Sequence, residues 1–92
     1  MNKSDLISTL AKKKNLPPKE AAAILSTILE TMTETLAQGE NIEIRGFGSF
    51  SVKEYEAYEG MNPRSGEKIK VKPKKLPFFK CGKELKERVD TF

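Results

Sequence analysis

Hydrophobic residues recur with helical spacing in the first part of the chain. Those of the first ten positions fall on one face of a short helix that Asn2 or Ser4 can cap. Pro17 and Pro18 end that helix and start a second one, expected from about Pro18 to Gln38. Its apolar positions keep the three-to-four-residue spacing of one buried helical face, and Gly39 follows as a left-handed capping residue.

After Gly39 the apolar period changes from helical to alternating, which predicts β-strands. We expect a strand over 41–45, a second from 49 to about 58, and a returning strand over 67–79, with a turn at 60–66. A short helix from about Gly82 to Val89 closes the chain. The expected order is two helices, three antiparallel strands and a helix, which is an α+β fold.

The paired strands between Glu54 and Lys72 contain too few apolar residues to cover a core. They should therefore project as a ribbon, and ten extended residues reach roughly 33 Å. An isolated hairpin of this kind is marginally stable in water, so it gains most from ordering on a partner. The grooves of duplex DNA admit a two-stranded ribbon.

Positive charge is concentrated in the second half of the chain. The formal net charge of the 92 residues is +4, but residues 60–86 carry nine Lys or Arg and two Glu, a balance of +7. Lys68, Lys70 and Lys72 share one side of the returning strand, and Lys74 continues the row if Pro73 does not displace it. The row suits a line of phosphates, and the alternative is protection of an exposed strand edge from aggregation.

Pro63 lies in the expected turn at the far end of the ribbon. A rigid apolar residue there can act as a wedge that unstacks two base pairs and kinks the duplex. The alternative is that Asn62-Pro63 is simply a common turn pair.

Few residues suit an enzyme or a metal site. The chain has no His and one cysteine, Cys81, which we expect to fill a small, partly buried position. We therefore expect no catalytic residue, no metal and no cofactor. No apolar stretch predicts a signal peptide or a membrane partner.

Three stretches carry a family resemblance: Arg45-Gly46-Phe47-Gly48-Ser49-Phe50, Asn62-Pro63-Arg64-Ser65-Gly66 and Phe79-Lys80-Cys81-Gly82-Lys83-Glu84-Leu85. In this order and spacing, the chain resembles the bacterial histone-like HU and integration host factor (IHF) family. The resemblance implies an intertwined dimer with a helical base, β-sheet saddles and two arms that wrap DNA. It also implies a place in the bacterial cytoplasm, on the nucleoid.

The resemblance also implies residue roles. Pro63 matches an intercalating proline, and Arg45 matches a basic residue that faces the minor groove. An aromatic dimer core is matched by Phe47, Phe50 and Phe79. We add to this core three residues of the second helix: Leu29, Met32 and Leu36. Phosphate-holding positions are matched by Lys3, Lys80, Lys83 and Lys86. The full expected DNA-binding set is Lys3, Arg45, Lys53, Met61, Asn62, Pro63, Arg64, Lys68, Lys70, Lys72, Lys74, Lys75, Lys80, Lys83 and Lys86.

The expected arm departs from the family pattern in two ways. Met61 stands where an arginine often precedes the Asn-Pro pair, and Glu54, Glu56 and Glu59 make the outgoing strand acidic. Carboxylates facing DNA would lower affinity. We favour pairing of these glutamates with lysines of the returning strand.

We accordingly expect a single domain over residues 1–92, with a helical dimerisation base at 1–39, a sheet at 40–81 bearing an arm at about 54–73, and a C-terminal helix at 82–92. Its expected function is low-specificity binding and bending of duplex DNA as a homodimer. One alternative is a subunit of a sequence-selective, IHF-like heterodimer. Another is a protein-binding decoy that keeps the fold, and RNA stays open as a second polyanionic partner.

Overall fold

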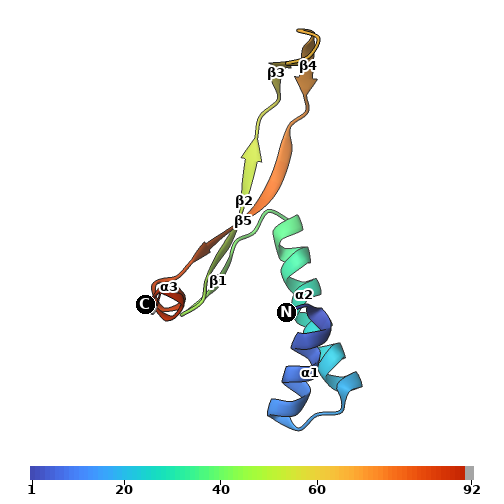
Figure 1. The fold of residues 1–92 in the computed structure, drawn as a ribbon, viewed down its shortest axis with the longest axis vertical. Coiled ribbons are helices and arrows are strands. Elements are labelled where there is room, and N and C mark those ends of the chain that lie inside the picture. The colour runs from blue at the N-terminus through green and yellow to red at the C-terminus, as the bar shows by residue number, and fades with distance from the viewer. Residues whose placement is uncertain (91–92) are drawn as a thin grey trace. The chain divides into compact units, whose positions relative to one another are not determined.

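The computed structural model describes residues 1–90. It contains three helices and five strands, in the order α1 (Lys3–Lys14), α2 (Pro18–Ala37), β1 (Ile42–Ile44), β2 (Gly48–Tyr55), β3 (Tyr58–Met61), β4 (Lys68–Val71), β5 (Lys74–Cys81) and α3 (Lys83–Val89) (Figure 1). The predicted α+β class is confirmed. The chain divides into two compact units, Met1–Thr35 and Leu36–Phe92. The end of the expected C-terminal segment, residues 91–92, lies outside the described residues.

Helix α1 begins and ends at residues with specific capping chemistry. The Asn2 side chain accepts a hydrogen bond from the Asp5 backbone N–H at 2.9 Å, and the Asp5 carboxylate accepts one from the Asn2 N–H at 3.0 Å. This reciprocal pair is a capping box, which satisfies two otherwise unpaired donors. At the other end Asn15 adopts a left-handed conformation with φ 53°. Of the two residues that could cap the helix, Asn2 rather than Ser4 is therefore the one that does.

Helix α2 starts at Pro18 and stops one residue before the predicted end. Gly39 follows with φ +82°, the left-handed conformation expected of it. Four threonine hydroxyls donate to the carbonyl four residues earlier, which satisfies them on the exposed helix surface: Thr27, Thr31, Thr33 and Thr35.

Within the second unit, three strands form an antiparallel sheet in the order β1-β2-β5. A turn from Ile44 to Phe47 joins β1 to β2, with Gly46 at φ +81° and the Phe47 N–H donating to the Ile44 carbonyl at 3.0 Å. Strands β3 and β4 pair separately as a distal hairpin, Tyr58–Val71, which extends beyond the end of the sheet (Figure 1). The sequence-based expectation of two long strands is therefore refined, because residues 56–57 and 72–73 interrupt them. Pro73 lies in the second of these interruptions.

Very little apolar side chain is buried in this chain. Among residues 1–90, the buried apolar residues are Ala11 and Ala21. The predicted dimer-core residues Leu29, Phe47 and Phe79 are 40, 44 and 39% exposed. A chain of this size with large apolar side chains at its surface needs a further surface to cover them.

Gly48 is the tightest point of the three-stranded sheet. A methyl group added there would lie 2.6 Å from the Lys80 carbonyl oxygen and 2.7 Å from the Phe79 ring. We expect Gly48→Ala to lower the free energy of unfolding by about 1–3 kcal/mol, because neither neighbour can move without disturbing the β2–β5 pairing. Urea denaturation measures this loss.

Gly60→Ala in the distal hairpin is the matched control, since its added methyl group would meet Tyr58 and Val71 at ordinary distances of 3.6 and 3.9 Å. If the two variants are equally stable, Gly48 does not have this packing role.

Candidate nucleic-acid interface

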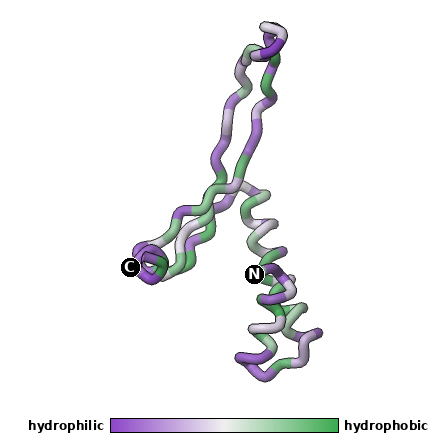
Figure 2. Tube along the Cα trace, viewed as in Figure 1, coloured by the Kyte–Doolittle hydropathy of each residue, from purple (hydrophilic) through white to green (hydrophobic). Residues whose placement is uncertain are grey.

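The two long strands keep a single register from the sheet into the distal hairpin. Gly48 pairs with Cys81 and Tyr55 with Lys74, and beyond the interruption Tyr58 pairs with Val71 and Met61 with Lys68. Two residues of each strand separate the two paired segments, but the alternation of hydrogen-bonded pairs shifts between them. The Gly82 N–H donates to the Phe47 carbonyl at 2.9 Å, which makes Tyr55–Lys74 a hydrogen-bonded pair, whereas the Asn62 N–H donates to the Glu67 carbonyl at 2.8 Å, which makes Tyr58–Val71 one. The faces of the sheet and of the distal hairpin are therefore described separately. Hydrophilic and hydrophobic residues are interspersed along both strands (Figure 2).

One face of the β2–β5 pair carries most of its lysines. We call it the basic face; its paired positions are Lys53, Lys74 and Lys80, together with Ser49, Ser51, Tyr55, Leu76 and Phe78. The opposite face of the sheet includes Phe50, Val52, Pro77 and Phe79. In the distal hairpin, Lys68 and Lys70 share one face as expected, with Glu59 and Met61, and Tyr58, Ile69 and Val71 share the other. Lys72 falls in the interruption, outside any strand.

Lys75 is separated from the lysines of the basic face. It pairs in register with Glu54 on the opposite face, and its Nζ lies 3.6 Å from a Glu54 carboxylate oxygen. The favoured pairing of the outgoing glutamates with returning lysines is thus present for Glu54. Both side chains are largely exposed, so the ion pair adds little stability. Glu59 lies opposite Lys70 in register, and Glu56 falls in the interruption.

Pro63 is held in a compact, exposed turn. The Asn62 N–H donates to the Glu67 carbonyl and the Gly66 N–H to the Asn62 carbonyl, each at 2.8 Å. The Asn62 side-chain oxygen accepts from the Arg64 N–H at 2.9 Å, which closes a local turn around the proline. The proline ring is therefore presented at the end of the hairpin, with Met61 68% exposed beside it.

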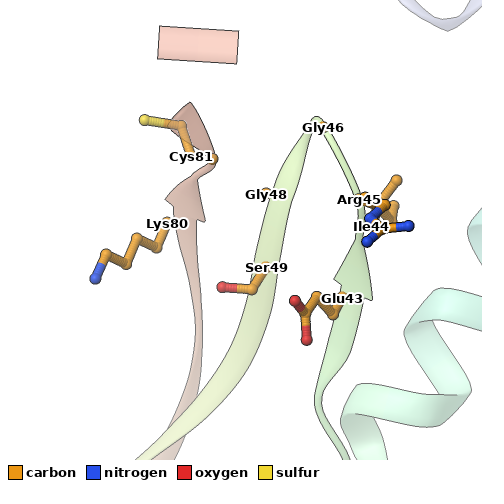
Figure 3. A pocket seen from close by; sticks show the side chains of 9 residues that line it. Glu43, Ile44, Arg45, Gly46, Gly48, Ser49, Lys80 and Cys81 are labelled. Carbon is orange, nitrogen blue, oxygen red and sulfur yellow. The ribbon is translucent and has the colours of Figure 1, made fainter. Parts of the chain in front are cut away.

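Arg45 borders a shallow hollow in the three-stranded sheet. Its walls come from the β1–β2 turn and the end of β5, including Glu43, Ser49 and Lys80. The Arg45 and Lys80 side chains lie on opposite flanks of this hollow (Figure 3). Cys81 also lines it and is an exposed free thiol, so the expectation of a partly buried cysteine is wrong. Its register partner is Gly48, which has no side chain to cover it.

The predicted aromatic core residues gather as one cluster. We call Phe47, Phe50 and Phe79 the aromatic cluster; the Phe79 ring centroid lies 5.5 Å from that of Phe47 and 4.7 Å from that of Phe50.

The other predicted residues lie on the helices. The first unit contains Lys3, Leu29 and Met32, and a shallow pocket there is lined by Lys3 and Leu29. The second unit begins at Leu36. Lys83 and Lys86 lie on α3, where Lys83 forms an exposed ion pair with Glu87 at 3.9 Å.

Two aromatic residues of the basic face were not predicted as site residues. Lys53 Nζ lies 3.7 Å from the Phe78 ring centroid, and Lys74 Nζ lies 5.8 Å from the Tyr55 centroid. The alternation of side chains along a strand could have shown this from the sequence. Because neighbouring residues face opposite sides, assigning Phe79 to the aromatic cluster places Phe78 on the other face with the lysines.

Comparison with known proteins agrees with this geometry. The family model described as bacterial DNA-binding protein matches residues 1–90. The chain belongs to this family. It is similar to integration host factor subunit beta of Idiomarina loihiensis, with 50% identity over 99% of this chain and 98% of the relative. It is also similar to DNA-binding protein HU of Thermotoga maritima, with 48% identity over 97% and 99% of the two chains.

Solved structures of the family share the fold. The HU chain in an Anabaena HU–DNA cocrystal structure has a TM-score of 0.86 and 38% identity, and the alignment covers 98% of both chains. A V42I mutant of HU from Thermotoga maritima has a TM-score of 0.73 and 46% identity, over 98% of this chain and 100% of that one. The resemblance to HU and IHF proposed from the sequence is confirmed.

The family consists of DNA-binding architectural proteins rather than enzymes. Within residues 1–90, no three His, Cys, Asp or Glu side chains are grouped as a metal site would require. None of the described helices has the length and apolar character needed to cross a bilayer.

Proposed function

We propose that the protein binds and bends duplex DNA as an architectural protein with low sequence specificity. The observation that carries the proposal is the basic face of the sheet, which is followed by a hairpin that bears two further lysines on one face and an exposed proline at its tip. Such a surface offers phosphates a row of cations without a rigid set of base-reading side chains. The HU chain of similar fold was crystallised with DNA.

Each hairpin would follow the minor groove and insert Pro63 between two base pairs. Unstacking costs a few kcal/mol per step, and the contacts that bent DNA makes with the sheet and helices offset it. Arg45 would face the minor groove, and Lys3, Lys80, Lys83 and Lys86 would hold flanking phosphates. Around the tip, Met61, Asn62 and Arg64 would border the kink, and Lys53, Lys68, Lys70, Lys72, Lys74 and Lys75 would line the path between.

Dimerisation would provide the surface that the exposed apolar side chains need. The aromatic cluster, Leu29, Met32 and Leu36 would lie in a core shared between two chains. Two chains also supply two hairpins, which allows the DNA to be held on both sides. The nucleoid of a bacterial cell is the expected site of action.

A heterodimer is the second candidate, because identity to an IHF beta subunit and to HU is nearly equal. The purified chain alone separates these cases. A stable dimer that bends duplexes of random sequence supports the homodimer, and a monomer that binds only after a second chain is added supports the heterodimer. A protein-binding decoy, which the acidic side chains of Glu54, Glu56 and Glu59 would motivate, is less favoured, because Glu54 is paired with Lys75.

Affinity for duplex DNA is expected to fall steeply with salt. A protein that neutralises six to ten phosphates loses about 10³- to 10⁵-fold in affinity between 50 and 200 mM salt. Fluorescence anisotropy with a labelled duplex measures the slope, and an RNA duplex of the same length tests selectivity for DNA. Binding that does not change with salt would rule out a phosphate-based interface.

A further inference from the structure

The basic face contains two lysine–aromatic pairs that cross between β2 and β5 in opposite directions. Lys53 of β2 lies over Phe78 of β5, and Lys74 of β5 lies near Tyr55 of β2. The first contact is close, at 3.7 Å from ammonium nitrogen to ring centroid, and the second is 5.8 Å. An ammonium within about 6 Å of a ring face is attracted by the electron-rich face of the ring.

Phe78 contributes nothing to the aromatic cluster. Its register partner is Ser51, and the neighbouring pairs on the same face are Lys53 with Leu76 and Ser49 with Lys80. The cluster formed by Phe47, Phe50 and Phe79 uses the other face of the sheet. Phe78 lies beside lysines, serines and Leu76 on the face opposite the aromatic cluster, so packing within that cluster does not explain its place.

We propose that Phe78 is a positioning residue that holds the Lys53 ammonium in place for a DNA phosphate. The inference rests on the proposed DNA-binding function. A lysine side chain loses much rotamer freedom when it binds a phosphate, and a ring that restricts it beforehand lowers that cost. Tyr55 and Lys74 form a weaker, second pair of the same kind, because their separation is near the limit of the interaction.

The ring positions a lysine without cancelling its charge. Lys75 shows the contrast, since its ammonium lies 3.6 Å from the Glu54 carboxylate and must leave that partner to meet a phosphate. Phe78 is neutral, so Lys53 keeps its full positive charge on the face that carries Lys74 and Lys80. Aromatic rings among basic residues are a recurring feature of nucleic-acid-binding surfaces.

A double-mutant cycle on duplex DNA tests the inference. We expect Phe78→Leu, which keeps an apolar side chain but removes the ring, to weaken binding about 2- to 5-fold for each copy of the pair in the complex. Phe78→Tyr keeps the ring and should bind like the wild type. Lys53→Met should reduce the slope of log affinity against log salt concentration by about 0.9 per copy. Adding Phe78→Leu to Lys53→Met should cause no further loss of affinity. Tyr55→Leu should have a smaller effect than Phe78→Leu.

If Phe78→Leu weakens binding equally in the wild type and in Lys53→Met, the inference is overturned, because the ring would then act independently of the lysine. Nuclear magnetic resonance gives a second test that needs no variant. The ε-methylene protons of Lys53 should be shifted upfield by the Phe78 ring in the free protein. Shifts at random-coil values would overturn the contact. Failure of the wild type to bind duplex DNA would instead refute the proposed function, and the resonance test would still report on the pair.

Discussion

Replacing Pro63 with alanine is expected to leave DNA binding in place while removing most of the bend. Pro63→Ala leaves the lysines of the basic face in place, so the salt slope expected from their proposed phosphate contacts should stay near its wild-type value. The variant removes the rigid apolar ring that we propose separates two base pairs, and with it the gain that would offset the few kcal/mol of unstacking. Energy transfer between dyes at the two ends of a short duplex measures the change in bend.

Pro73→Ala is the matched control for this experiment. Pro73 lies in the same ribbon but in the interruption before β5, distant in sequence from the tip. Its replacement should leave the bend unchanged while altering the stiffness of the strand. Equal energy transfer for the wild type and Pro63→Ala would show that another group produces the kink, with the exposed Met61 as the next residue to replace.

Phe79→Ala is expected to destabilise the protein more than Gly48→Ala does. The Phe79 ring contacts both other members of the aromatic cluster, so its removal leaves Phe47 and Phe50 without their common neighbour. Truncation of a fully buried phenylalanine costs about 3–5 kcal/mol. Phe79 is 39% exposed in the single chain, so a loss in this range requires that a second chain covers it. Urea denaturation at several protein concentrations measures the loss and shows whether stability depends on association.

Phe78→Ala provides the control, because Phe78 is the neighbouring residue on the opposite face. It should lower the free energy of unfolding far less than Phe79→Ala and should not change the concentration dependence. Similar losses for the two variants would contradict the assignment of Phe79 to a shared core.

Local chemistry explains which parts of the fold were predictable. The capping of α1 by Asn2 and Asp5, the start of α2 at Pro18 and the left-handed Gly39 depend on a few adjacent residues, so the sequence shows them directly. The α+β order follows from the change of apolar period after Gly39. The hairpin tip is also local, because Asn62, Pro63 and Gly66 determine its turn.

Features that depend on pairing between distant strands were less accessible. The position of the interruptions, the separation of Lys75 from the basic face and the exposure of Cys81 all require the β2–β5 register. Phe78 and Phe79 are adjacent and chemically identical, and only the register assigns one to the lysines and the other to the aromatic cluster. From the sequence, the family resemblance assigned Phe79 to the aromatic core and assigned no role to Phe78.

The pairing register that the sheet and the distal hairpin share constrains how this protein can change in length during evolution. A single-residue deletion in one strand, at Ala57 for instance, would turn every later side chain of that strand to the wrong side of the ribbon. Loss or gain of two residues opposite two residues, as at 56–57 and 72–73, would keep cations and apolar groups on their own sides. The length of the hairpin, and with it the distance that the hairpin spans along a duplex, can therefore change only by an equal and even number of residues in both strands.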